Sequence, residues 1–261
     1  MIPLVMGVLN VTPDSFSDGG RFLEHAAAIA HGDVLIADGA QVVDVGGESS
    51  RPGADVVPDD EELRRVVPVV AALSPKVRIS IDTVKPVVAR AAIDAGATLI
   101  NDVSASPELA EIAGEAGIGY VVMHRVGDPK TMQDHPHYDD VVAEVSAFLA
   151  LHAARAADAG VKEIWVDPGI GFAKLPAHNL SLLRHLDQIV DLGYPVLVGT
   201  SRKAFLGDLL GASDGNDEPT QVGDRLEASI ATVTWAMAHG ASMIRVHDVK
   251  ASVEAAKVVA A

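Results

Sequence analysis

Eight short apolar runs recur along the chain, and polar or ionisable residues follow each one directly. Ala-rich stretches with a helical pattern separate the runs, which begin roughly 20 to 45 residues apart. This alternation is typical of repeated βαβ units, which build a parallel sheet. Eight units in a chain of 261 residues predict one α/β domain over residues 1–261, a (β/α)8 TIM barrel. The runs are Leu4–Leu9, Val42–Val45, Val77–Ile81, Leu99–Ile100, Tyr120–Met123, Ile164–Val166, Val196–Val198 and Met243–Val246.

The polar residues that follow the runs predict where the active site lies. In a TIM barrel the site is formed at the carboxyl ends of the strands, by residues from several strands and the loops after them. Carboxylates, amides and cations all occur at these positions in this chain, so we expect them to converge on one mouth of the barrel. They are Asn10, Glu48, Asp82, Asn101, Asp102, His124, Asp167, Ser201, Arg202, Lys203, Arg245 and His247.

Helices are expected between the runs, and several end on a glycine of the kind that closes a helix in the left-handed conformation. The expected helices are Glu24–Asp38, Asp59–Ala72, Lys85–Asp94, Pro107–Ala116, Asp139–Ala159, Asn179–Asp191, Lys203–Leu210 and Arg225–His239. The closing glycines are Gly39, Gly96, Gly117, Gly160, Gly193 and Gly240. Two polar connections, 10–20 and 46–53, are long and rich in Gly and Pro, which is typical of loops that cover an active site.

Composition excludes several classes of function. The formal net charge of -16 disfavours nucleic acid and anionic membranes as partners, and it means that an anionic substrate needs a local cluster of cations. No apolar stretch approaches the ~18 residues that would span a bilayer, and no basic segment precedes the first apolar run, so no signal peptide is expected. The absence of cysteine removes thiolate chemistry and favours a cytoplasmic location weakly.

Seven segments closely resemble the dihydropteroate synthase family, in order and at fitting spacings along the whole chain. They are 6–20, 44–53, 81–83, 101–104, 167–172, 201–203 and 245–247. Ser50 stands where many members have Thr, and Arg125-Val126 stands where Met-Gln is common. The resemblance implies a transferase that joins 6-hydroxymethyl-7,8-dihydropterin pyrophosphate to p-aminobenzoate, giving 7,8-dihydropteroate and pyrophosphate. It also implies Mg²⁺ as cofactor, a homodimer formed by outer helices, and inhibition by sulfonamides.

Residues that could recognise the pterin are present. A pterin presents an amino group and a ring N–H along one edge, which a carboxylate and a neighbouring amide can read. The resemblance assigns Asp167 and Asn101 to that edge, and Asp82 to the N–H of the reduced side. It assigns Lys203 to the ring carbonyl and a ring nitrogen. Further pterin contacts are expected from Met123, Phe172, Gly199 and Arg245. For any single strand-end Asp, capping of the next helix is an alternative role.

Other residues are expected to hold the leaving group and the second substrate. Arg245 and His247 alternate, so both can reach a phosphate from one face of their strand, although a surface pair with Asp248 is an alternative. The resemblance makes Asn10 both a pyrophosphate contact and the Mg²⁺ ligand. The expected p-aminobenzoate contacts are Phe16, Ser50, Arg51, Pro52 and Ser201. The expected catalytic residues are Asp18, which faces the pterin cation of an SN1-like displacement, together with Arg51 and Lys203.

Two other functions share part of this pattern. A methyltetrahydrofolate-type methyltransferase has the barrel and some pterin contacts, but it does not require the segments 14–18, 51–52 and 201–203. A non-catalytic pterin-binding paralogue would typically have lost Arg51, Lys203 or the first loop, and all of these are present.

Overall fold

The computed structural model describes residues 2–12, 21–49, 56–127, 131–132, 136–216 and 218–261, without the side chains of 21–24. All eight predicted strands are present, and their bounds differ from the predicted runs by at most two residues. The strands are β1 (Leu4–Asn10), β2 (Val42–Gly46), β3 (Arg78–Asp82), β4 (Leu99–Asp102), β5 (Gly119–Met123), β6 (Ile164–Asp167), β7 (Leu197–Val198) and β8 (Met243–Val246).

The strands form one parallel sheet in the order β6-β5-β4-β3-β2-β1-β8-β7. The two outer strands, β6 and β7, also lie close together, and an isolated parallel bridge joins Val166 to Val196. The amide of Val166 also donates to the carbonyl of Pro195 at 3.0 Å. The sheet is therefore a nearly closed barrel, and the expected fold class is confirmed.

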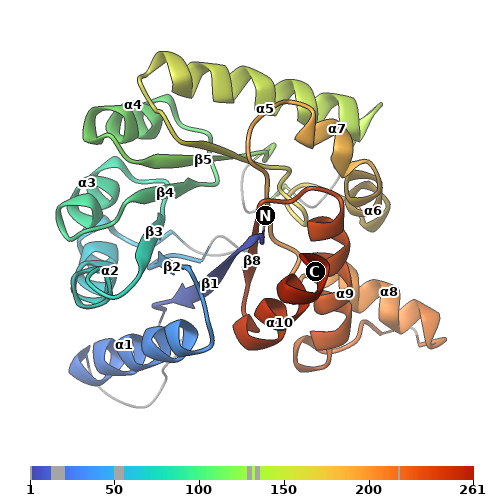
Figure 1. Cartoon of the computed structure of the whole chain (residues 1–261), viewed down its shortest axis with the longest axis horizontal. Coiled ribbons are helices and arrows are strands. Elements are labelled where there is room, and N and C mark those ends of the chain that lie inside the picture. Colours follow the sequence, from blue (N-terminus) through green and yellow to red (C-terminus); the bar gives the residue numbers. More distant parts are fainter. Residues whose placement is uncertain (1, 13–20, 50–55, 128–130, 133–135, 217) are drawn as a thin grey trace.

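Helices lie outside the strands around the barrel (Figure 1). They are α1 (Arg21–Ala37), α2 (Asp59–Leu73), α3 (Pro86–Asp94), α4 (Pro107–Ala116), α5 (Val141–Asp158), α6 (Pro176–Arg184), α7 (Leu186–Val190), α8 (Ala204–Ser213), α9 (Leu226–Ala238) and α10 (Val249–Val259). The prediction of one helix over 179–191 was wrong, because the helix begins earlier and is divided into two. Pro176, a favoured first helical residue, begins α6, and the chain breaks at His185 before α7. Helix α10 was not predicted. The six predicted closing glycines all have positive φ.

Two hydrophobic clusters fill the structure. The larger one contains residues from the strands and from the surrounding helices. The smaller one belongs to the strands alone and consists of Met6, Val42, Leu99, Val121, Trp165, Leu197 and Met243, with Leu4 packed against it. Below it, Arg78 donates to both carboxylate oxygens of Glu163, at 2.8 and 2.7 Å, and the indole of Trp165 donates to the same carboxylate at 2.7 Å. This packed layer is the floor of the site.

Candidate active site

The predicted site residues on the strands form the layer immediately above the apolar floor. Because side chains alternate along a strand, residues two positions apart face the same side. Starting from the floor residues and moving two positions toward the carboxyl ends gives this layer: Val8, Asp44, Asn101, Met123, Asp167, Gly199 and Arg245. Two further positions along the chain give Asn10 at the end of β1, and Ser201 and His247 just beyond the ends of β7 and β8. The structure therefore brings Asn10, Asn101, Asp167, Ser201, Arg245 and His247 to one mouth of the barrel.

Arg245 lies at the centre of this layer and is held by two carboxylates. Its Nε donates to Asp44 Oδ2 at 2.6 Å, and its Nη2 donates to Asp82 Oδ2 at 2.8 Å. The amide of Asn101 donates to the same oxygen of Asp44 at 3.0 Å. Burial alone would lower the pKa of Arg245, but the carboxylates of Asp44 and Asp82 raise it. Arg245 therefore remains a guanidinium in a fixed orientation, and the surface pairing with Asp248 was wrong as an alternative.

Burial raises the pKa of Asp82 from 3.8 to about 7, with Arg245 opposing the shift and Asp44 adding to it. The folded protein thus binds this proton more tightly than the unfolded chain does. The contribution of Asp82 to the free energy of unfolding is then fully present below about pH 4 and is lost as the pH rises through about 7.

This linkage predicts a pH-dependent difference between wild type and Asp82→Asn, whose side chain does not titrate. We expect the wild-type free energy of unfolding minus that of the variant to fall between about pH 4 and pH 7, and to level off above that range. Urea unfolding at a series of pH values measures this difference. A difference that is flat, or that rises with pH, would contradict the assignment.

The turn after β6 presents Asp167 and Phe172. Asp167 accepts a hydrogen bond from the amide of Gly169 at 2.7 Å. Gly169 has a φ of +66°, and a Cβ at this position would lie 1.9 Å from the carbonyl oxygen of His124, so only glycine fits. Burial raises the pKa of Asp167, and the neighbouring Lys203 opposes the shift.

Lys174, which sequence reasoning did not single out, is buried beneath the same turn. Its Nζ lies 2.9 Å from Nδ1 of His124 and donates to the carbonyls of Gly169 at 3.1 Å and Phe172 at 3.0 Å. Burial lowers its pKa to about 7, although Asp167 opposes the shift. Burial, reinforced by Lys174, also lowers the pKa of His124 to about 3. These contacts fix the backbone that carries Asp167 and Phe172.

Lys203 comes immediately before α8 and reaches back to the same turn. Its Nζ donates to the carbonyl of Ile170 and lies 4.6 Å from the centre of the Phe172 ring. Burial lowers the pKa of Lys203 to about 8, against the attraction of Asp167. A cation beside an aromatic ring and a carboxylate can bind a flat polar heterocycle by hydrogen bonding and stacking.

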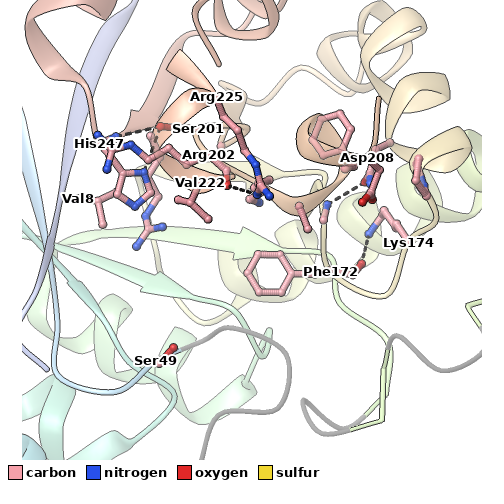
Figure 2. A pocket seen from close by; sticks show the side chains of 18 of the residues that line it. Val8, Ser49, Phe172, Lys174, Ser201, Arg202, Asp208, Val222, Arg225 and His247 are labelled. Atoms are coloured by element: carbon pink, nitrogen blue, oxygen red, sulfur yellow. Dashed lines mark hydrogen bonds between the residues drawn. The ribbon is translucent and has the colours of Figure 1, made fainter. Parts of the chain in front are cut away.

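At the other side of the mouth, Ser201 contacts His247. Its Oγ accepts from the backbone amide of His247 at 3.2 Å and lies 3.1 Å from Nδ1 of the same residue. The hydroxyl proton can therefore go to Nδ1, which leaves the ring proton of neutral His247 on Nε2. Figure 2 shows this pair at one end of a cavity that has Phe172 and Lys174 toward its other end. The cavity measures about 900 Å³, and its lining includes Asn10, Lys203 and Arg245.

Some strand-end residues have other partners. Asp102 is a structural residue, although it holds the turn before α4 and is not the N-cap of that helix, which is Ser106. It accepts from the amides of Ser104 at 2.7 Å and Ser106 at 2.6 Å, and from the hydroxyl of Tyr120 at 2.7 Å. Glu48 forms an ion pair with Lys85 at 2.7 Å. Five predicted site residues lie outside the described part of the chain: Phe16, Asp18, Ser50, Arg51 and Pro52.

The described residues include no group of three or more His, Cys, Asp or Glu side chains that could hold a metal by themselves. Asn10 is a single amide on the wall of a cavity that also contains Arg245 and His247. This donor set fits Mg²⁺, which often keeps several waters and takes further ligands from a substrate's phosphates. In the described part of the chain, no helix is long and apolar enough to cross a bilayer.

The fold and this cavity together define a class of protein. Buried carboxylates and an amide, with cations on two sides, line the mouth of a TIM barrel, which is the arrangement of a barrel enzyme that binds a polar ring and an anionic group. Comparison with known proteins agrees with this class. The model of the pterin binding enzyme family matches residues 6–247.

Individual relatives narrow the class further. The dihydropteroate synthase of Mycobacterium leprae is 48% identical over 264 residues, covering 98% of this chain and 92% of that protein. The Escherichia coli enzyme of the same name is 47% identical, covering 99% and 91%. The solved structure of Xanthomonas albilineans dihydropteroate synthase with 4-aminobenzoic acid has a TM-score of 0.89 at 46% identity, covering 98% of this chain and 91% of that one. The chain therefore belongs to the dihydropteroate synthase family of pterin-binding enzymes, and the predicted family and transferase class are confirmed.

Proposed function

We propose that this chain condenses 6-hydroxymethyl-7,8-dihydropterin pyrophosphate with p-aminobenzoate in folate biosynthesis. The main support is the polar layer above the barrel floor. Buried Asp82, Asn101 and Asp167 lie in it with Arg245 at the carboxyl ends of the strands, and Arg245 and Lys203 line the cavity. Membership of the synthase family supports it, as does a relative from Xanthomonas albilineans solved in complex with 7,8-dihydropteroate. Because the chain belongs to the synthase family, we do not propose the methyltransferase function for it.

The pterin would bind across this layer. The carboxylate of Asp167 and the amide of Asn101 would read the amino edge, and Asp82 would accept from the reduced side of the ring. Lys203 would donate to the ring carbonyl and a ring nitrogen. Met123, Phe172 and Gly199 would contact the ring, with Arg245 over its face, because a guanidinium stacks well on a flat heterocycle.

The pyrophosphate would bind beside the pterin, at Asn10, Arg245 and His247. Arg245 and His247 both lie on the cavity wall, and the guanidinium of Arg245 and Nε2–H of His247 would donate hydrogen bonds to the phosphates. Asn10 would ligate Mg²⁺, which when bound neutralises charge on the phosphates. We expect these donors to stabilise the negative charge that develops on the leaving oxygen.

For p-aminobenzoate, we propose contacts with Phe16, Ser50, Arg51 and Pro52 from the two long loops. Its carboxylate would lie near Ser201, where the chain enters α8, since the first amides of a helix attract anions. Asp18 would face the pterin cation.

The reaction would then proceed by dissociation followed by capture. The bond between the pterin methylene carbon and the pyrophosphate oxygen breaks, and its electron pair leaves with pyrophosphate. The lone pair of the aniline nitrogen forms the new carbon–nitrogen bond, and one N–H proton is released. No strong general base is needed, because the aniline nitrogen is already unprotonated at neutral pH. The protein's task is to stabilise the cation and to exclude water.

We also propose a cytoplasmic homodimer. Three apolar side chains remain exposed on the outer helices: Leu209 on α8 (36%), and Leu226 (38%) and Trp235 (48%) on α9. They lie on outer helices, as the resemblance implies for a dimer contact. Sedimentation of the purified protein tests the oligomeric state, and a monomer at micromolar concentration would argue against this part of the proposal.

The direct test of the proposed activity is product formation. The purified protein is incubated with both substrates and Mg²⁺, and 7,8-dihydropteroate is detected by mass. Binding of the pterin pyrophosphate without conversion would identify a non-catalytic paralogue instead.

Sulfonamides are expected to inhibit this activity in competition with p-aminobenzoate, because their sulfonyl group can take the place of the carboxylate. Selective exclusion of such a mimic would need a loop feature that clashes with its extra ring. The segment 14–18 has no residue inserted after Phe16, and Pro52 is present. A Yersinia pestis relative, 44% identical with a TM-score of 0.89, was solved as a sulfonamide drug complex. Steady-state inhibition at several p-aminobenzoate concentrations checks this, and an unchanged apparent KM would refute it.

A further inference from the structure

Arg202 has an unusual backbone conformation between two residues of the proposed site. Its φ is +60°, in the left-handed region, where a residue other than glycine, Asn or Asp is uncommon. On either side of it lie Ser201, which contacts His247, and Lys203, which contacts the turn after β6. Such a conformation is strained and persists only where surrounding contacts hold it in place. The contacts of Arg202 must therefore hold this backbone conformation in place.

The backbone of Arg202 is held from α9. Its amide donates to Oγ of Ser229 at 2.9 Å, and its carbonyl accepts from Nη1 of Arg225 at 3.2 Å. Arg225 and Ser229 are both buried. Gly207 makes room for Arg225, because a Cβ there would lie 2.5 Å from the guanidinium. Both polar backbone groups of Arg202 thus have partners in the packed helical layer.

The side chain of Arg202 contacts Asp248, which lies just after β8. Its Nε donates to Asp248 Oδ2 at 3.0 Å and its Nη2 to Asp248 Oδ1 at 2.5 Å. This is a two-pronged contact, which fixes orientation as well as distance. Asp248 precedes α10 in the cap position, yet its carboxylate makes no capping hydrogen bond, although Asp is a preferred cap residue. The carboxylate is used by Arg202 instead.

The ion pair between Arg202 and Asp248 lies next to two proposed site residues in the chain. Asp248 directly follows His247, and Arg202 directly follows Ser201. The ion pair therefore ties the segment before α8 to the segment before α10, beside the hydrogen bonds between Ser201 and His247 at 3.1 and 3.2 Å. These two segments are the ones that would hold p-aminobenzoate and pyrophosphate.

We propose that Arg202 and Asp248 act as a positioning pair that sets the separation of Ser201 and Lys203 from His247. This inference rests on the proposed function of these three residues. A purely stabilising role would be weak, because the two side chains are 40% and 21% exposed and exposed ion pairs contribute little to stability. Small displacements of groups that must act together, in contrast, can slow a reaction by up to about 100-fold.

The test uses Arg202→Gly, Asp248→Asn and the double variant. Glycine accepts a φ of +60°, so Arg202→Gly removes the guanidinium while keeping the backbone turn. We expect each single variant to lower kcat at least about tenfold, with a thermal midpoint close to that of wild type. The double variant should be no slower than the slower single variant, because both changes break the same contact. Arg90→Met, which breaks the exposed pair with Glu115, is the matched control and should stay within about twofold of wild type.

A binding measurement separates this inference from the proposed activity. Inorganic pyrophosphate with Mg²⁺ is titrated into each protein by calorimetry, which needs no turnover. Loss of pyrophosphate affinity by about tenfold in both single variants supports the pair, even if wild type forms no dihydropteroate. Single variants that keep both kcat and pyrophosphate affinity within twofold would overturn the inference. So would losses that multiply in the double variant, or losses that follow unfolding.

Discussion

Lys203→Ala is expected to lower kcat/KM by at least about 100-fold while the protein remains folded. Lys203 would make two hydrogen bonds to the pterin, and each hydrogen bond to a charged group contributes about 1.5 to 3 kcal/mol, or roughly one to two decades. Its present contacts, with the carbonyl of Ile170 and the ring of Phe172, lie at the mouth and not in the barrel floor. Steady-state kinetics with both substrates varied, together with thermal unfolding, measures both effects.

Two further variants control this experiment. Lys76→Ala removes an exposed lysine that pairs with Asp33 on the surface, and its kinetics should match wild type within about twofold. Asp167→Asn keeps the shape of the side chain but removes its charge, so it should weaken pterin binding in the same direction as Lys203→Ala. Near-normal pterin affinity and turnover in folded Lys203→Ala would refute the assignment.

Arg245→Met is expected to affect both stability and activity. The substitution leaves the buried carboxylates of Asp44 and Asp82 without their shared cation, and breaking a buried ion pair in this way costs about 3 to 5 kcal/mol. It also removes the group proposed to contact the pterin face and the pyrophosphate. We expect a large fall in the urea midpoint and at least a 100-fold loss of kcat/KM.

A triple variant separates these two effects of Arg245. Arg245→Met combined with Asp44→Asn and Asp82→Asn removes the unpaired charges, so stability should recover toward wild type. Activity should not recover, because the donors of Arg245 to the pyrophosphate are still missing and the proposed pterin contact of Asp82 is changed as well. Recovery of activity in the triple variant would show that Arg245 serves only to neutralise the two carboxylates.

The eight strands could be predicted because each is a short β-branched run that contrasts with an Ala-rich helix. The mouth could be predicted because the carboxyl ends of parallel strands meet at one edge. Helix α10 was missed because it follows the last strand, beyond the spacers between runs. The break at His185 was missed because the helical pattern continues through it from α6 into α7.

Asp44 is a further site residue that the sequence pattern could have predicted. It is a carboxylate inside the apolar run of β2, at the same parity as Val42 on the barrel floor. A charged residue on the inward face of a buried strand needs a partner, and alternation places Asp44 on the same inward face as Arg245. Lys174 offered no such signal, because its turn reverses direction at Gly169 and Gly171. Its burial beneath His124 depends on that three-dimensional path. The same holds for Arg202 and Asp248, which are 46 residues apart.

Quantifying both products in one time course tests directly whether this polar layer is a synthase active site. Purified protein is mixed with the pterin pyrophosphate and Mg²⁺, with and without p-aminobenzoate, and pyrophosphate and 7,8-dihydropteroate are quantified together. We predict that both appear in equal amounts, and that pyrophosphate release requires p-aminobenzoate. Rapid pyrophosphate release without p-aminobenzoate would indicate that water captures the cation in an unprotected site. The absence of both products, with the pterin pyrophosphate bound, would contradict the assignment of this polar layer as a synthase active site.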